Sequence, residues 1–249
     1  MPPAIETRGL MRKYGRLIAV HDLNLQVNAG AIFGFLGPNG SGKSTTVKML
    51  TSLLRPTAGE ILINGLDMRT HALEVKQMIG VLPEDLGLFD YLSIWEHLMM
   101  IGPIYGLSHQ ETARRAEQLL RFLDVWQTRH TLAHQASYGM KKKCSLGMAL
   151  LHNPRILFLD EPFEGIDPVS ARHIKDLLLR LSAHGVTVFL TSHILEVVEK
   201  LVHGFAIIVR GEMVSHYEVA ELAASGLTLE DVFFRHVNPN TDAELEWLG

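Results

Sequence analysis

The sequence predicts an α/β fold built on a parallel β-sheet, for three reasons. Residues 31–36 are nearly all apolar, which is typical of a strand buried on both faces. The short apolar runs 79–82, 156–159 and 186–190 are each bounded by Gly, Pro or polar residues. Helical patterns lie between these runs, so strands and helices alternate along the chain as they do around a parallel sheet.

Two further segments predict antiparallel strands. In residues 22–28 every second residue is apolar, the period of a strand with one buried face. Residues 204–215 read as an antiparallel pair around Arg210-Gly211. We therefore expect a small antiparallel β subdomain near the N-terminus beside the parallel sheet.

Several helices are predicted by their first residues. Ser93 and Ser108 each precede a glutamate, Glu96 and Glu111, by three residues, which is the capping-box pattern. Asp167 precedes a proline, as an N-cap does before the first helical residue. Apolar residues then recur at helical spacing in two of these segments: Ala116, Leu119, Leu120 and Leu123, and Ile174, Leu177, Leu178 and Leu181, the latter followed by Gly185 as a stop.

The same patterns suggest how the chain is organised. Residues 89–153 contain helical patterns and no convincing strand, although they lie between strands of the expected sheet. We expect one domain over 1–236, with an α/β core and β subdomain in 1–88 and 154–219 and a helical subdomain inserted at 89–153. Residues 220–249 are expected to form a C-terminal helical segment and a tail that is turn-rich from residue 238.

Composition narrows the classes of function. The 249-residue chain has 23 basic and 27 acidic residues, a formal charge of −4, whereas a dedicated nucleic-acid binder usually has a basic excess. The one cysteine, Cys144, has no partner for an intramolecular disulfide, and the lack of a disulfide fits a protein of the reducing cytosol. We expect Cys144 to be a core residue. No run approaches about 18 apolar residues, and residues 1–13 lack the apolar stretch of a signal peptide. We therefore expect neither a membrane span nor binding to nucleic acid.

A phosphate-binding loop is the strongest motif. It follows the apolar run 31–36, precedes a helical run at 45–54, and matches G-x-x-x-x-G-K-[ST] with Gly37, Pro38, Asn39, Gly40, Ser41, Gly42, Lys43, Ser44 and Thr45. Glycines let successive N–H groups face inward as an anion nest at a helix N-terminus. Lys43 would bridge the β- and γ-phosphates of a nucleotide, and the Ser44 hydroxyl would ligate Mg²⁺. The alternative is a glycine-rich turn with a surface lysine.

A second, acidic site follows another apolar strand. The run 156–159 ends in Asp160 and Glu161, and Pro162 stops the strand. Because ligands of parallel sheets bind at the carboxyl ends of the strands, we expect Asp160 beside the phosphate loop as a Mg²⁺ ligand. Glu161 would then lie within reach of a water in line with the γ-phosphate, as a general base. The alternative is an exposed acidic pair at a strand end.

With these two sites in place, the order of motifs resembles the ATP-binding subunit of ABC transporters, which are P-loop NTPases with a RecA-like core. Tyr14, in Arg-Lys-Tyr-Gly, matches the aromatic residue that stacks on adenine. Ser137 and Gly139 lie where the family has its LSGGQ signature. Asp167, in Gly-Ile-Asp-Pro, matches the D-loop, and His193 matches the histidine that follows the last core strand.

This resemblance implies a dimer with shared sites. In the family two subunits pack head to tail, and each ATP lies between the phosphate loop of one and the signature of the other. Ser137 and the Gly139 amide would contact the γ-phosphate of ATP held by a second ATPase subunit, identical or different. Asp167 would help to form the dimer contact, and His193 would contact the γ-phosphate within its own subunit. Ser137 could instead act simply as a helix N-cap.

Two positions depart from the family pattern. Glu84 stands where the family has a glutamine that ligates Mg²⁺ and senses the membrane partner. A carboxylate can ligate Mg²⁺ as well, but when ionised it cannot donate a hydrogen bond to the attacking water. We count Glu84 among the catalytic and metal-binding residues and expect Glu84→Gln to keep or raise activity. The signature is Ala-Ser-Tyr-Gly-Met at 136–140, which retains the two residues that touch phosphate.

The expected function is that of an ATP-hydrolysing subunit that powers a transmembrane permease. The segments Leu-Pro-Glu, Ser-x-Gly-Met-Lys and Leu-Glu-Asp-Val-Phe are similar to the branch whose ATPase and membrane subunits are separate chains, mostly exporters. The chain would then be peripheral at the cytoplasmic face of the cell membrane. Its expected docking surface is an apolar cluster that could equally fill the core between subdomains: Leu86, Leu88, Phe89, Tyr91 and Trp95.

Two other functions remain open at this point. A non-transport ABC ATPase acting on ribosomes or DNA usually has two fused ATPase units or a long coiled-coil insertion, and neither is present. An ATP-binding switch with negligible hydrolysis would retain the phosphate loop without turnover. The pair His130 and His134 has metal-ligand spacing, but no third ligand is evident, which favours a solvated or core role.

Overall fold

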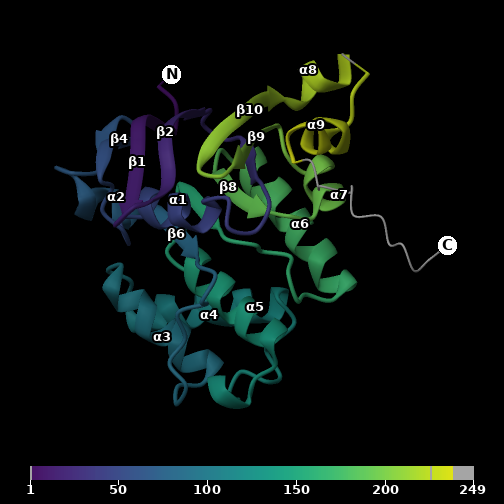
Figure 1. Ribbon diagram of the computed structural model, residues 1–249. Coiled ribbons are helices and arrows are strands. Elements are labelled where there is room, and N and C mark those ends of the chain that lie inside the picture. The colour runs from purple at the N-terminus through teal and green to yellow at the C-terminus, as the bar shows by residue number, and fades with distance from the viewer. Residues whose placement is uncertain (1, 225, 238–249) are drawn as a thin grey trace, which may run out of the picture.

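Two β-sheets form the framework of the molecule (Figure 1). The computed structural model describes residues 2–224 and 226–237, so the expected tail from residue 238 lies outside the described residues. The larger sheet has the order β10-β9-β3-β8-β7-β6, and its strands are β3 (Ile32–Leu36), β6 (Ile79–Leu82), β7 (Ile156–Leu159), β8 (Thr187–Ser192), β9 (Gly204–Val209) and β10 (Glu212–Glu218). The smaller sheet has the order β2-β1-β4-β5, with β1 (Ile5–Tyr14), β2 (Leu17–Val27), β4 (Ala58–Ile63) and β5 (Leu66–Asp67).

Strand pairing confirms the expected α/β class. Strands β3, β6, β7, β8 and β9 run parallel, and β10 pairs antiparallel with β9. The four apolar runs expected to be buried strands are β3, β6, β7 and β8. The expected pair at 204–215 is also present, and its first strand pairs with β3, so the hairpin extends the parallel sheet. The smaller sheet is antiparallel throughout.

Alternate residues of the central strands face two separate apolar cores. On β3, Ile32 and Leu36 lie in the core beneath α5, α6 and α7, whereas Phe33 and Phe35 lie in the core shared with α1 and the smaller sheet. Because side chains of a strand alternate between its faces, a strand with a core on each side is apolar at every position. This explains the continuous apolar runs in the sequence.

The helices surround these sheets, with α3, α4 and α5 gathered at one end of the molecule (Figure 1). Residues 89–153 contain these three helices and a short 3₁₀ turn, and no strand of either sheet. The helices are α1 (Lys43–Leu50), α2 (Ala72–Met78), α3 (Ile94–Ile104), α4 (His109–Phe122), α5 (Tyr138–Leu150), α6 (Pro168–Ala183), α7 (Leu195–Glu199), α8 (Val219–Ala224) and α9 (Leu229–His236), and the 3₁₀ turn is Ala133–Gln135.

The first helix differs from the run expected at 45–54. It begins at Lys43, inside the phosphate loop, and ends at Leu50. Ser52 has a left-handed backbone, with φ of +59°, and the amides of the next two residues both turn back to the Lys48 carbonyl. The backbone therefore closes the helix one turn earlier than the side-chain pattern indicates.

One of the two expected capping boxes is wrong in part. At Ser93 both hydrogen bonds of the box are present. At Ser108 the hydroxyl accepts from the Glu111 amide at 3.2 Å, but the Glu111 carboxylate instead pairs with Arg114 and Arg115 on the same helix. These guanidinium groups lower the pKa of Glu111 to about 2, because they stabilise its charged form.

Candidate functional site

The phosphate loop forms one wall of a cleft of about 590 Å³, a volume typical of small-molecule sites. The other walls come from the start of the smaller sheet and from the ends of β6, β7 and β8. Its lining residues are Tyr14, Leu17, Ala19, Asn39, Gly40, Gly42, Lys43, Ser44, Thr45, Glu84, Glu161, Glu164 and His193. The structure thus brings together residues from five separate parts of the chain.

Lys43 lies at the centre of the loop and is 6% exposed. Its Nζ donates to the carbonyls of Gly37 at 2.8 Å and Pro38 at 3.2 Å. The same atom lies 3.8 Å from the Glu161 carboxylate. Burial lowers the pKa of Lys43, and the carboxylates of Glu161 and Asp160 oppose this shift. The ammonium group is therefore held inside the curl of the loop, facing the cleft.

The loop also presents unpartnered donors. Gly42 caps α1 with φ of +111°, and a Cβ at this position would lie 2.5 Å from the Ala19 carbonyl oxygen, so only glycine fits. This cap contributes no side-chain hydrogen bond, which leaves the first amides of α1 available to an anion at the positive end of the helix dipole. Buried Ser41 Oγ has no hydrogen-bond partner. These features fit a polyphosphate.

Asp160 lies at the end of β7, next to Ser44, and is 2% exposed. Its carboxylate accepts hydrogen bonds from the hydroxyls of Thr191, at 2.5 Å, and Ser44. Burial raises the pKa of Asp160, and these two hydrogen bonds lower it. A hydroxyl and a carboxylate oxygen side by side are hard ligands of the kind that Mg²⁺ prefers, and Mg²⁺ usually takes its remaining ligands from phosphates and water.

Glu161 follows in a left-handed conformation, with φ of +49°. Its carboxylate contacts His193 twice, at Nδ1 (3.0 Å) and at the backbone N–H (3.3 Å). Its own amide donates to Thr191 Oγ1 at 3.0 Å. The Glu161 carboxylate thus lies between Lys43 and His193.

Tyr14 and Glu84 line the mouth of the cleft. The Tyr14 side chain is 44% exposed, and the Arg12 guanidinium lies 4.5 Å from its ring centroid on one face. Glu84 follows β6 and is exposed; its charge contributes to raising the pKa of Asp160. Both side chains line the cleft, and their contact with a nucleotide stays a prediction.

Ser137, Gly139 and Asp167 do not line this cleft. Ser137 caps α5, accepting from the Met140 amide at 3.3 Å, so the capping role weighed from the sequence is present. Asp167 caps α6 in the same way. Gly139 lies against Gly165, whose carbonyl would be 3.5 Å from an added Cβ. Within one chain, then, these residues do not join the phosphate loop.

Sequence reasoning missed three residues of the site. Thr191 bridges Asp160 and Glu161, and the only local sign of it is a hydroxyl residue ending an apolar strand. Glu164 lines the cleft. Lys142 is buried and donates to carbonyls of the Glu161 loop, although it is one of three consecutive lysines and nothing in the sequence distinguishes it.

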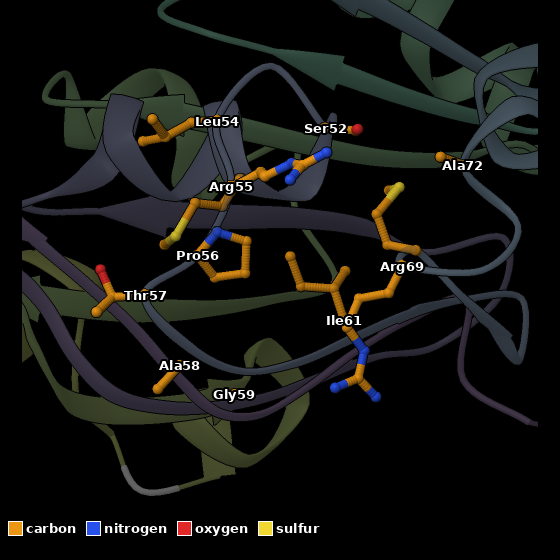
Figure 2. Close-up of a pocket in the computed structure, with 12 residues that line it drawn as sticks. Ser52, Leu54, Arg55, Pro56, Thr57, Ala58, Gly59, Ile61, Arg69 and Ala72 are labelled. Atoms are coloured by element: carbon orange, nitrogen blue, oxygen red, sulfur yellow. The ribbon is translucent and has the colours of Figure 1, made fainter.

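A second cavity, of about 560 Å³, lies between the end of α1 and the smaller sheet (Figure 2). Arg55 and Arg69 lie at its edge, above an apolar floor that includes Ile61. The Arg69 guanidinium is already paired with Asp67 at 2.8 Å and Glu60 at 3.0 Å. None of the site residues expected from the sequence lines this cavity.

The histidine pair does not form a metal centre. His134 is exposed, and its Nδ1 lies 2.9 Å from the Asp90 carbonyl oxygen. Over the described residues, no group of three or more His, Cys, Asp or Glu side chains is placed to hold a metal ion. Cys144 is fully buried, as expected of a core residue.

The fold and the cleft together define a P-loop nucleotide-binding protein, and comparisons with known proteins specify its family. A family model described as "ABC transporter" matches residues 20–164. The chain is 36% identical over 211 residues to the linearmycin resistance ATP-binding protein LnrL of Bacillus subtilis, covering 85% of this chain and 68% of that protein. It is 33% identical over 221 residues to the Nod factor export ATP-binding protein I of Cupriavidus pinatubonensis, covering 89% of this chain and 68% of that protein.

A solved structure agrees with these sequence relatives. An ATP-binding subunit of an ABC transporter superposes with a TM-score of 0.86 and 28% identity, covering 93% of this chain and 98% of that chain. The chain therefore belongs to the ABC transporter family, as an ATP-binding subunit, and this is a family of ATPases.

Proposed function

We propose that this chain hydrolyses Mg-ATP in the cleft at the phosphate loop and thereby powers a separate transmembrane subunit. The observation that carries this proposal is that Lys43, Glu161 and His193 line one cleft, while the Asp160 carboxylate is buried beside the cleft residue Ser44. The chain would act as one ATPase domain over 1–236. A positioned general base typically contributes about 10²–10⁴ to a rate, and Glu161 has the contacts that such a role requires.

Each residue of the cleft has a distinct task in this proposal. The loop amides and Lys43 bind the phosphates and stabilise the charge that develops on them. The Tyr14 ring stacks on the base. Two atoms of His193, Nδ1 and the backbone N, contact the Glu161 carboxylate. These contacts direct the carboxylate toward the γ-phosphate position, and Glu161 removes the proton of the attacking water.

Ser44 and Asp160 would hold Mg²⁺, with Glu84 able to supply a further oxygen from the mouth of the cleft. Mg²⁺ held by these residues would offset the negative charge of the phosphates. The hydroxyl of Ser44 already points to the Asp160 carboxylate, so the two oxygens need little movement to share an ion.

The position of Ser137, Gly139 and Asp167 away from the cleft supports a head-to-tail dimer. Their own chain does not bring them to the phosphate loop, so they would complete the site of a second ATPase subunit. A site that is complete only in the dimer makes ATP binding favour association. Whether the second subunit is identical is an outcome of the test below.

The membrane partner would dock beside the helical segment. Over residues 2–224 and 226–237, no helix is long and apolar enough to cross a membrane. Phe89 is 58% exposed and Tyr91 83% exposed. Leu86 is buried, which corrects its place in the expected docking cluster. It lies instead at the floor of an adjoining groove of about 370 Å³, whose lining comes from β6, α3 and α5.

We propose that transport is in the direction of export, at the cytoplasmic face of the membrane. The support comes from the relatives, one of which is named for resistance and another for export. The described residues contain no coiled-coil insertion, and the chain is acidic. A ribosome- or DNA-associated role therefore has no supporting feature.

The test is ATP-driven dimerisation of Glu161→Gln, measured by light scattering with and without Mg-ATP, beside the ATPase rate of the unaltered chain. Removal of the base should trap ATP in a dimer that Ser137→Arg abolishes. If the unaltered chain binds ATP without turnover, the protein is a binding switch and the hydrolytic function is refuted. If Glu161→Gln binds ATP and stays monomeric, dimerisation of this chain alone is refuted, and either a different ATPase chain completes the site or closure requires the membrane subunit.

A further inference from the structure

A buried lysine joins α5 to the loop that follows β7. Lys142 is 2% exposed, and its Nζ donates to the backbone carbonyls of Glu161, at 2.5 Å, and Glu164, at 2.8 Å. The same atom lies 5.2 Å from the ring centroid of Tyr138. Burial lowers the pKa of Lys142, and the nearby carboxylates of Glu164, Glu161 and Asp160 oppose this shift.

Besides the hydrogen bond from the Glu161 amide to Thr191 Oγ1, the loop that receives these hydrogen bonds has, among the residues that the structure describes, only long backbone hydrogen bonds between Glu161 and Ile166. Strand β7 ends at Leu159, and Glu161 and Gly165 both have left-handed backbones, with φ of +49° and +67°. Within the loop, the hydrogen bond from the Glu164 amide to the Glu161 carbonyl is long, at 3.3 Å. The two bonds from Lys142 are shorter, and hydrogen bonds from a charged donor are stronger than those between neutral groups.

The first turn of α5 also packs against this loop. A Cβ added at Gly165 would lie 2.5 Å from the Tyr138 ring, so the ring lies directly on the Gly165 backbone. The loop is thus held at one end by the first turn of α5 and along its length by Lys142 in the next turn. The residues that begin α5 are the ones proposed to touch the nucleotide of the partner subunit.

We propose that Lys142 is a positioning residue for the general base Glu161, and that it links engagement of the signature at one site to the base at the other site. The inference rests on the proposed function. Lys142 bonds the backbone of Glu161 itself, so a shift of α5 on contact with the partner's nucleotide moves the base of the same chain. Lys142 does not line the nucleotide cleft, so its effect falls on turnover and not on binding.

The first experiment compares steady-state ATPase kinetics of Lys142→Met with those of the unaltered chain. Methionine keeps the apolar stem and removes the ammonium group. Because misplacement of a catalytic group by about 1 Å costs up to about 10²-fold in rate, kcat should fall about 10–100-fold while the KM for ATP stays within about 3-fold. Lys142→Arg, which retains a charged donor, should recover most of kcat.

The matched control is Lys175→Met. Lys175 approaches the same loop from α6, with its Nζ 5.9 Å from the Phe163 ring centroid, but within the described part of the chain it donates no hydrogen bond to a loop carbonyl. Its removal should leave kcat within about 2-fold. Equal losses in the two variants would overturn the inference, because they would show a general effect of charge near the loop.

A double-mutant cycle separates positioning from general destabilisation. If Lys142 acts through Glu161, then Lys142→Met should cost nothing further in a Glu161→Gln background, whereas independent effects would multiply. ATP-driven dimerisation of Lys142→Met/Glu161→Gln should equal that of Glu161→Gln. Should methionine prevent folding, as judged by thermal denaturation, Lys142→Gln replaces it, since its amide donates to one carbonyl.

The outcomes distinguish this inference from the function beneath it. Absence of turnover in the unaltered chain would overturn both. If Lys142→Met turns over ATP at the unaltered rate, or has a raised KM with a normal kcat, the positioning role of Lys142 is overturned. The proposed ATPase function is not affected by either result.

Discussion

Replacing Thr191 by valine removes two hydrogen bonds from the centre of the site while keeping the shape of the side chain. Thr191 is fully buried. Its hydroxyl donates to Asp160 at 2.5 Å and accepts from the Glu161 amide at 3.0 Å. One hydroxyl therefore orients both the expected metal ligand and the expected base.

The magnitude follows from what the substitution leaves unpaired. A buried donor or acceptor without its partner costs about 1–3 kcal/mol. Asp160 keeps its hydrogen bond to Ser44, so its contribution to the destabilisation lies at the lower end of this range. The Glu161 amide loses its only partner among the described residues, so its contribution is larger. Thr191→Val should lower the free energy of unfolding by about 2–4 kcal/mol and kcat by at least about 10-fold, because the base is no longer held.

The loss should also depend on pH. Burial raises the pKa of Asp160 above that of the unfolded chain, so the native state holds this proton more tightly and stability falls as pH rises through that range. Loss of the Thr191 hydrogen bond raises the pKa further. The stability difference between Thr191→Val and the unaltered chain should therefore grow from acid toward neutral pH.

Urea unfolding at several pH values and steady-state ATPase kinetics check both effects. The control is Thr191→Ser, which keeps the hydroxyl and loses one methyl group; it should cost about 1 kcal/mol and leave kcat nearly unchanged. If valine and serine have equal effects on kcat, the bridging hydroxyl does not hold the site and the reasoning is refuted.

Three other predictions test separate parts of the molecule. Glu84→Gln should keep or raise the ATPase rate, because it removes a negative charge from the mouth of a cleft for phosphates; a large loss would show that the carboxylate has a role of its own. Phe89→Glu should release the membrane partner in detergent co-purification while basal ATPase persists, since Phe89 is exposed, and intact co-purification would count against docking there. Gly102→Ala should lower the free energy of unfolding, measured by urea denaturation, by about 1–3 kcal/mol, because the added Cβ would lie 2.0 Å from Thr112. The control Gly147→Ala, whose added Cβ has its nearest neighbour at 3.5 Å, should be neutral or stabilising.

Local chemistry explains why much of the site could be predicted from the sequence. The phosphate loop is one continuous segment whose glycines, lysine and serine act through their own backbone and side chains, so its composition is enough to recognise it. The buried strands were recognisable because both of their faces meet apolar cores. Helix starts at Ser93 and Asp167 were predicted correctly for the same reason, since a cap bonds amides only two or three residues away.

Other features depended on which of several possible neighbours a side chain contacts in the folded structure. The Glu111 carboxylate had two possible uses, and only the folded helix shows that Arg114 and Arg115 take it from the Ser108 cap. Leu86 reads as a member of an apolar cluster, yet its neighbours in the fold bury it while Phe89 stays exposed.

The class of fold, the phosphate loop and the acidic pair that ends β7 can be recognised from the amino-acid sequence, because each depends on the residue types within short continuous segments. Tertiary structure alone decided that Thr191 bridges Asp160 and Glu161 and that Lys142, among three adjacent lysines, is the one that turns inward to the Glu161 loop. The physical reason is that a hydrogen bond between residues 19 or 31 positions apart depends on how helices and strands pack, and no local pattern records that packing.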